Sequence, residues 1–192
     1  MGVMGSAPQP QGVTVRPVHP EDFEPLSRLD LTYPTGRYLQ LERSGPSPEL
    51  VFRLAWRMRE PGERLYAQYE ADWLRRAASR ADLFVVAQEV GSPVGLLIAV
   101  VPEWTNAGEI TDLAVARPMR GRGAGRALVT AAVDWGRERD LRALWVEPRT
   151  DNAEAIDFYL RMGFRISGFN DRRYSNEDGQ SGETTMYMHL GL

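Results

Sequence analysis

Hydrophobic and polar residues alternate over residues 13–18, near the start of the chain, and this two-residue period predicts a first strand. Pro20 follows, with acidic residues directly after it, so we expect a helix to begin there. Residues 1–12 are rich in Gly, Pro and Gln and show no periodicity. That composition is typical of a disordered tail.

Residues 30–48 form an irregular stretch that Pro and Gly interrupt repeatedly. A helical period follows in two stretches, 48–59 and 63–79, on either side of Pro61-Gly62. The apolar residues with this spacing are Val51, Leu54, Ala55 and Met58 in the first stretch and Leu65, Tyr69, Trp73 and Ala77 in the second. The pattern therefore predicts that segment 30–80 is mainly helical.

Strands and helices alternate in the second half of the chain. Strands are predicted at 83–88, 94–101, 109–115, 141–147, 164–169 and 184–190, and helices from the turn at 120–125 to about residue 139 and at 152–162. The turn residues 90–93 between the first two strands indicate a hairpin. This order predicts an α/β or α+β fold with a layered sheet.

Composition removes several chemistries. The chain has 192 residues and a net charge of −3, and its 23 basic residues are all Arg. Without Lys there is no Schiff-base chemistry and no P-loop lysine. Without Cys there are no disulfides, thiolate metal sites or thiol nucleophiles. Two His leave little room for a metal site or a Ser-His-Asp triad, and we expect no metal.

Length and charge also indicate where the protein acts. The length suits one domain, which we expect to span 13–192. A mildly acidic balance argues against nucleic acid as a partner. The sequence contains neither an apolar run of about 20 residues nor a signal peptide. We therefore expect a cytoplasmic protein that does not bind membranes, and a homodimer is left open.

A Gly-rich turn between a strand and a helix is the most informative segment. Gly121, Gly123 and Gly125 stand at alternate positions, so backbone N–H groups can converge on one point at the helix start. Arg120, Arg122 and Arg126 add positive charge. The combination suits a phosphate or pyrophosphate, although the G-x-G-x-x-G and P-loop patterns both fail. The alternative is a plain Gly-rich connection with solvated arginines.

The motif Arg120-x-x-Gly123-x-Gly125 resembles the pyrophosphate loop of the GNAT superfamily of acetyl-CoA-dependent N-acetyltransferases. Its usual preface, an apolar strand (Ile110-x-x-Leu113-x-Val115) and a nearby proline, is also present. The resemblance implies a mixed, mostly antiparallel twisted sheet of about seven strands with helices on both faces. It also implies acetyl-CoA as co-substrate, with the Val115 amide polarising the thioester.

The stretch 144–164 is similar to the second signature of that superfamily, with Asn152, the pair Phe158-Tyr159 and Gly163 at matching positions. The resemblance implies that Asn152 contacts the cofactor and that Tyr159 protonates the departing thiolate. The alternative for Tyr159 is a core aromatic residue. The residues implied at the cofactor are Leu113, Ala114, Val115, Arg120, Gly121, Arg122, Gly123, Ala124, Gly125, Arg126, Asn152 and Tyr159.

Three carboxylates are candidates for the proton acceptor. Some members of the superfamily carry a catalytic Glu where this chain has Glu109. Strict alternation would put Glu109, Thr111 and Leu113 on one face of the strand, with Ile110, Asp112 and Ala114 on the other. Either Glu109 or Asp112 could therefore face the cleft, and Glu147 is a third candidate. The alternative is a solvated acid.

The acceptor side depends on two segments. Within 30–80, the irregular stretch places Tyr33 and Tyr38 as expected pocket residues. The tail 168–188 is similar to the streptothricin-type branch, which acetylates an amine of a cationic antibiotic, and its alternative is an acidic surface loop. The expected substrate contacts are Tyr33, Tyr38, Asp112, Glu147 and Asp171.

The resemblance implies direct acetyl transfer to a primary amine of a small molecule, such as a cationic antibiotic or metabolite, in a ternary complex. Tyr159 and Glu109 are the expected catalytic residues. Two alternatives stay open, an acetyltransferase of protein or peptide amino termini and an acyl-CoA-binding module without turnover.

Overall fold

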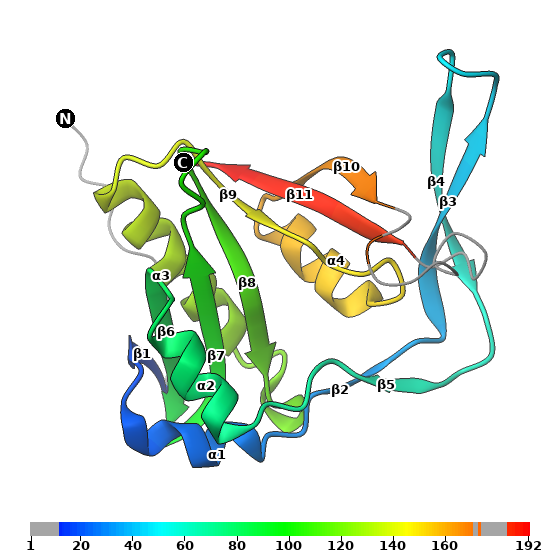
Figure 1. The fold of residues 1–192 in the computed structure, drawn as a ribbon. Coiled ribbons are helices and arrows are strands. Elements are labelled where there is room, and N and C mark those ends of the chain that lie inside the picture. Colours follow the sequence, from blue (N-terminus) through cyan, green and yellow to red (C-terminus); the bar gives the residue numbers. More distant parts are fainter. Residues whose placement is uncertain (1–11, 171–172, 174–183) are drawn as a thin grey trace. The chain divides into compact units, whose positions relative to one another are not determined.

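The computed structural model describes residues 12–170, 173 and 184–192 (Figure 1). The chain divides into two compact units, each built from two separate stretches of sequence. Unit 1 comprises Met1–Leu31 and Ala67–Leu141, and unit 2 comprises Thr32–Tyr66 and Arg142–Leu192. The single domain predicted over 13–192 stays a prediction, and the predicted tail lies outside the described residues except for Gly12.

Unit 1 is a four-stranded antiparallel sheet in the order β1-β6-β7-β8. Its strands are β1 (Val13–Pro17), β6 (Leu83–Glu89), β7 (Ser92–Val100) and β8 (Ala107–Val115). Its helices are η1 (Pro20–Asp22), α1 (Phe23–Ser27), α2 (Ala71–Ala78), η2 (Arg117–Met119) and α3 (Ala124–Glu138). The predicted first strand, the helix start at Pro20 and the hairpin at 83–101 are confirmed.

Helices cover both faces of this sheet. Every second residue of the central strands lies on one face of the sheet. On this face Leu96 and Ile98 of β7 pack against Phe23 of α1 and Leu74 of α2. The intervening residues, including Leu97, are buried as well, and α3 packs on β6 and β7. A sheet buried on both faces explains why β7 reads as a continuous apolar run.

Unit 2 contains a three-stranded antiparallel sheet in the order β9-β11-β10, with α4 beside it. These elements are β9 (Ala143–Val146), α4 (Ala153–Arg161), β10 (Arg165–Asn170) and β11 (Thr185–Gly191). Two small antiparallel pairs complete the unit, β2 (Thr32–Pro34) with β5 (Glu63–Leu65) and β3 (Arg37–Ser44) with β4 (Val51–Met58).

The predicted helix at 48–59 is wrong, because this stretch forms β4 and pairs with β3 along its whole length. Its apolar spacing fits a helix, but Val51, Phe52 and Trp56 are residue types that favour strands. The partner strand β3 directly precedes it across residues 45–50, within the stretch predicted to be irregular, so segment 30–80 contains more strand than helix and is not mainly helical. The predicted helix at 63–79 is shorter than expected, because only Ala71–Ala78 is helical and Glu63–Leu65 forms β5.

The predicted fold class is confirmed. The chain has a mixed α/β fold whose described strands are mostly antiparallel, with helices packed against them. None of the helices in that part of the chain is long and apolar enough to cross a membrane.

Candidate functional site

The Gly-rich turn of unit 1 connects β8 to α3 through η2, as the strand–turn–helix prediction required. Gly121 and Gly123 have φ angles of 74° and 94°, which only glycine adopts without strain. Gly123 is the N-cap residue of α3, and the first turn of that helix contains no acidic residue. The unpaired N–H groups of a helix start therefore face a loop that carries positive charge, which suits an anion.

Two of the three arginines at this turn make contacts within the protein that stabilise the turn. Arg120 Nε donates a hydrogen bond to the carbonyl oxygen of Val115 over 3.2 Å. Arg122 Nη2 lies 3.0 Å from a carboxylate oxygen of Glu89 on β6. Arg126 is exposed on the first turn of α3. The loop is therefore fixed by its own arginine contacts before any ligand is considered.

A β-bulge in β8 overturns the strict alternation predicted for its acidic residues. Ile98 lies opposite Asp112 and Ala99 opposite Ile110, so Thr111 is the extra residue. Glu109 lies opposite Val100, which shares the face of Ile98. Glu109 and Asp112 consequently lie on the same face of the sheet, whereas the sequence placed them on opposite faces.

Asp112 is partly buried and contacts Tyr69, an aromatic residue that the helical spacing predicted only as an apolar residue of the core. The hydroxyl of Tyr69 donates a hydrogen bond to Asp112 Oδ1 over 2.8 Å. Burial raises the pKa of the Asp112 carboxyl above its ordinary value, although hydrogen bonds from Tyr69 and Thr111 oppose that rise. The rings of Tyr69 and Trp73 stack with centroids 5.2 Å apart. The contact spans 43 residues, and no local spacing announces it.

Unit 2 carries the second predicted set of residues. Asn152 is the N-cap of α4, and its side-chain oxygen accepts a hydrogen bond from the Ala155 N–H over 3.1 Å, as predicted for a helix start. Tyr159 lies on α4 and is 7% exposed. Its ring makes edge contacts with Phe158 and Phe164, with centroids 5.4 and 5.2 Å apart. Packing thus fixes the orientation of the Tyr159 ring.

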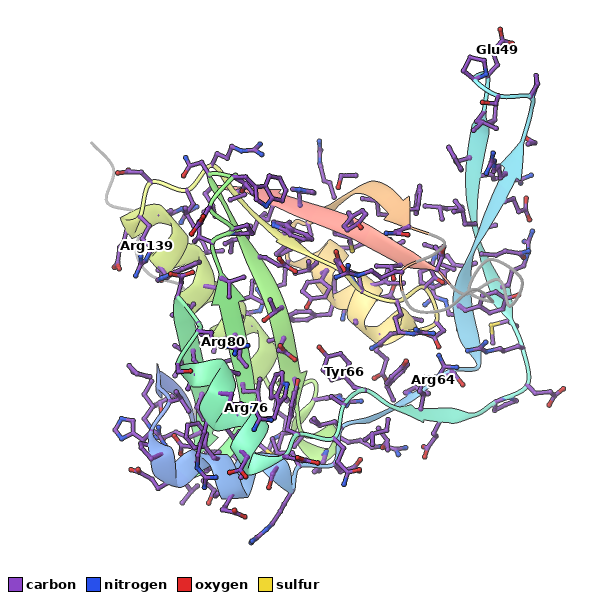
Figure 2. All side chains as sticks on the ribbon, in the orientation of Figure 1. Glu49, Arg64, Tyr66, Arg76, Arg80 and Arg139 are labelled. Carbon is purple, nitrogen blue, oxygen red and sulfur yellow. The ribbon has the colours of Figure 1, made fainter. Side chains whose placement is uncertain are left out.

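A fully buried carboxylate, Asp151, precedes this helix, and the sequence did not single out its side chain as a charged centre. It accepts hydrogen bonds from Arg64 Nη1 over 2.5 Å and from Arg149 Nε over 3.2 Å, and Arg59 Nη2 lies 3.6 Å away. The hydroxyl of Tyr33 donates to it over 3.4 Å. Arg64 extends from β5 (Figure 2). We call these five residues the Asp151 cluster.

Tyr33, one of the expected pocket residues, is therefore buried in the Asp151 cluster at 3% exposure. Burial and the charge of Asp151 raise the pKa of Tyr33 to about 12. Tyr38, the other, is partly exposed, with the Arg59 guanidinium 5.2 Å from its ring centroid. Contact of either residue with a substrate stays a prediction.

The other predicted substrate contacts have different outcomes. Glu147 is paired with Arg173 over 3.0 Å, and Asp171 lies outside the described residues. The expected site residues thus fall in both units. Glu109, residues 112–115, the Gly-rich turn and Arg126 belong to unit 1, whereas Tyr33, Tyr38, Glu147, Asn152 and Tyr159 belong to unit 2. Among the described residues, no group of three or more His, Cys, Asp or Glu could hold a metal ion.

The sequence and the fold were compared with protein families, curated relatives and solved structures. The model of the acetyltransferase (GNAT) family matches residues 49–164. A streptothricin acetyltransferase from Streptomyces lavendulae is 36% identical over 107 residues, which cover 56% of each chain. The chain spans about half the length of the curated relatives it matches.

Two solved structures are similar over nearly the whole chain. A nourseothricin acetyltransferase superposes with a TM-score of 0.75 at 26% identity, covering 94% of this chain and 99% of the other. A structure from Bacillus anthracis str. Ames in complex with acetyl coenzyme A has a TM-score of 0.76 with the same coverage. Its identity is 20%, so this second likeness shows the fold alone.

Proposed function

The chain belongs to the GNAT acetyltransferase family, and on that premise we propose that it is an enzyme that transfers the acetyl group of acetyl-CoA to a primary amine of a small molecule. The observation that carries the proposal is the Gly-rich turn at the start of α3. Its left-handed glycines and unpaired helix N–H groups suit the pyrophosphate of coenzyme A. The strand that leads into it carries two carboxylates on one face.

The names of the relatives support a cationic antibiotic as the acceptor. A Streptomyces lavendulae relative bears the name streptothricin acetyltransferase, and a structural neighbour at 26% identity is a nourseothricin acetyltransferase. We therefore propose a streptothricin-like amine as the acceptor class. A cytoplasmic location and a homodimer remain predictions.

The proposed chemistry is one addition and one elimination at the thioester carbonyl. The amine nitrogen forms a bond to that carbon, and the bond from carbon to sulfur then breaks. The nitrogen loses a proton, which Glu109 or a water molecule bound to it accepts. The thiolate gains a proton from the Tyr159 hydroxyl. The Val115 amide, at the end of β8, stabilises the developing oxyanion.

Calorimetry and a free-thiol assay test the proposal. Titration with acetyl-CoA is expected to show binding, and release of free thiol is expected with streptothricin or with another amine in a panel. A panel that includes peptides separates small-molecule acceptors from amino termini. Acetyl-CoA binding without thiol release for any amine would identify a non-catalytic module, and absence of binding would refute the enzyme altogether.

Tyr159→Phe examines the proposed acid. We expect turnover to fall about 100-fold, because general acid catalysis typically contributes that much, while affinity for acetyl-CoA changes little. Tyr187→Phe is the matched control, since Tyr187 lies on β11 in the same unit and is partly exposed. Unchanged turnover in Tyr159→Phe would remove Tyr159 from this role.

A further inference from the structure

Asp112 is a partly buried carboxylate without a paired cation among the described residues. Its hydrogen bonds come from the hydroxyls of Tyr69 and Thr111, which are neutral groups. Arg76 lies on α2 and Arg80 lies two residues after the end of this helix (Figure 2), but no ion pair joins either one to Asp112. The chain has 23 arginines, so a shortage of basic residues does not explain why none of the described ones pairs with this carboxylate.

Stability does not explain this arrangement. Removing a carboxylate from water costs free energy unless a cation compensates it. The raised pKa of Asp112 expresses that cost, because burial disfavours the charged form. A neutral residue of the same shape would avoid the cost, so the charge of Asp112 calls for a partner that the described part of the chain does not supply.

The surroundings of Asp112 favour an organic cation as that partner. Tyr69 holds the carboxylate through its hydroxyl and is 5% exposed, so its own position is fixed by packing. Trp73, stacked on Tyr69, is 38% exposed and offers an aromatic surface. A carboxylate beside aromatic rings suits an ammonium group attached to a carbon skeleton.

The position of Asp112 on β8 suits the acceptor. Asp112 precedes Val115 by three residues, which is about 10 Å along a strand. Val115 leads directly into the Gly-rich turn, so carboxylate and turn belong to one continuous segment of unit 1. An ammonium group at Asp112 would therefore lie about 10 Å from the end of β8, so a second, neutral amine of the same acceptor would reach the acetyl group.

We propose that Asp112 binds the ammonium group of a cationic acceptor, that Tyr69 is the positioning residue for this carboxylate, and that Trp73 contacts the carbon skeleton of the acceptor. This inference rests on the proposed function. It defines the acceptor class as molecules with more than one amine, of which one is bound as ammonium at Asp112 while another, neutral amine is acetylated, and it adds two aromatic residues to the acceptor site.

Calorimetry tests the inference on the full chain. Streptothricin is titrated into protein saturated with coenzyme A, for the wild type, Asp112→Asn, Tyr69→Phe and Asp134→Asn. The last variant is the matched control, since Asp134 is an exposed residue of α3 and the charge change is the same. We expect Asp112→Asn to raise the dissociation constant of streptothricin about 10-fold or more, because hydrogen bonds to charged groups are strong.

Two further measurements separate a binding role from a structural one. The affinity of coenzyme A is expected to be equal in all four proteins. The melting temperature of Asp112→Asn is expected to be unchanged or higher, because the variant removes a desolvated charge. Tyr69→Phe is expected to raise the dissociation constant of streptothricin about 3-fold, because the variant loses the hydrogen bond that positions the carboxylate but keeps the carboxylate itself.

Unchanged streptothricin affinity in Asp112→Asn would overturn the inference, and so would a lower melting temperature together with weaker coenzyme A binding. If the wild type does not bind streptothricin, the same titration uses the amine that gives thiol release. If no amine gives thiol release, the proposed function fails, and this inference fails with it. A wild type that acetylates an amine while Asp112→Asn behaves identically refutes the inference alone.

Discussion

Replacing Asp151 by Asn removes the negative charge at the centre of the Asp151 cluster. The carboxylate is fully buried, and three guanidinium groups lie within 3.6 Å of it. The side chains of Arg59, Arg64 and Arg149 are 31%, 40% and 29% exposed, so water can reach part of each when the charge is lost. The cost is therefore expected at the low end of the range for a broken buried ion pair.

Breaking a buried ion pair from one side typically costs 3–5 kcal/mol, so we expect the free energy of unfolding to fall by about 3 kcal/mol. For a chain of this length, about 3 kcal/mol lowers the melting temperature by roughly 6–12 °C. Calorimetry and urea unfolding at pH 7 measure both quantities. Because Asp151 directly precedes the N-cap residue of α4, the loss should also loosen the start of the helix that carries Tyr159.

Asp157→Asn provides the control in the same unit. Asp157 pairs with Arg37 over 2.8 Å, and both side chains are a third or more exposed. Such pairs contribute about 0–1 kcal/mol, so this variant should remain near the wild type. If Asp151→Asn cost no more than Asp157→Asn, the view that the Asp151 cluster stabilises unit 2 would be wrong.

Three more substitutions test the two units. Gly95→Ala should destabilise the protein by about 1–3 kcal/mol in urea unfolding, because an added Cβ would lie 2.7 Å from the Ala114 carbonyl oxygen; wild-type stability would contradict this packing. Gly123→Ala should weaken acetyl-CoA binding in calorimetry, since a φ of 94° is strained for any other residue; unchanged affinity would argue against the turn as the anion site. Burial and Arg142 lower the pKa of His189, so the unfolded chain binds the proton more readily and stability present above about pH 6.5 is lost as pH falls. His189→Gln should flatten that acid slope, and an unchanged slope would exclude His189 as its source.

Local patterns predicted the elements whose partners are close in sequence. The hairpin at 83–101 and the Gly-rich turn follow from a two-residue period and from glycine spacing, and both were found where predicted. Contacts between distant residues could not be predicted in this way. Tyr69 and Asp112 are 43 residues apart, and Arg64 and Asp151 are 87 apart. The strand at 51–58 has a different explanation, because its partner at 37–44 is adjacent in sequence but its apolar residues repeat with a helical period.

The bulge at Thr111 interrupts the alternation of side chains between the two faces of β8. Residues before it follow one parity and residues after it follow the other, so Glu109 and Asp112 share a face although they are three positions apart. Deletion of this single residue would leave Glu109 and Asp112 two positions apart in a regular strand, so both carboxylates would stay on the same face. The extra residue therefore compensates for the odd spacing between the two carboxylates, and a chain with regular spacing at this point would present the same acidic face.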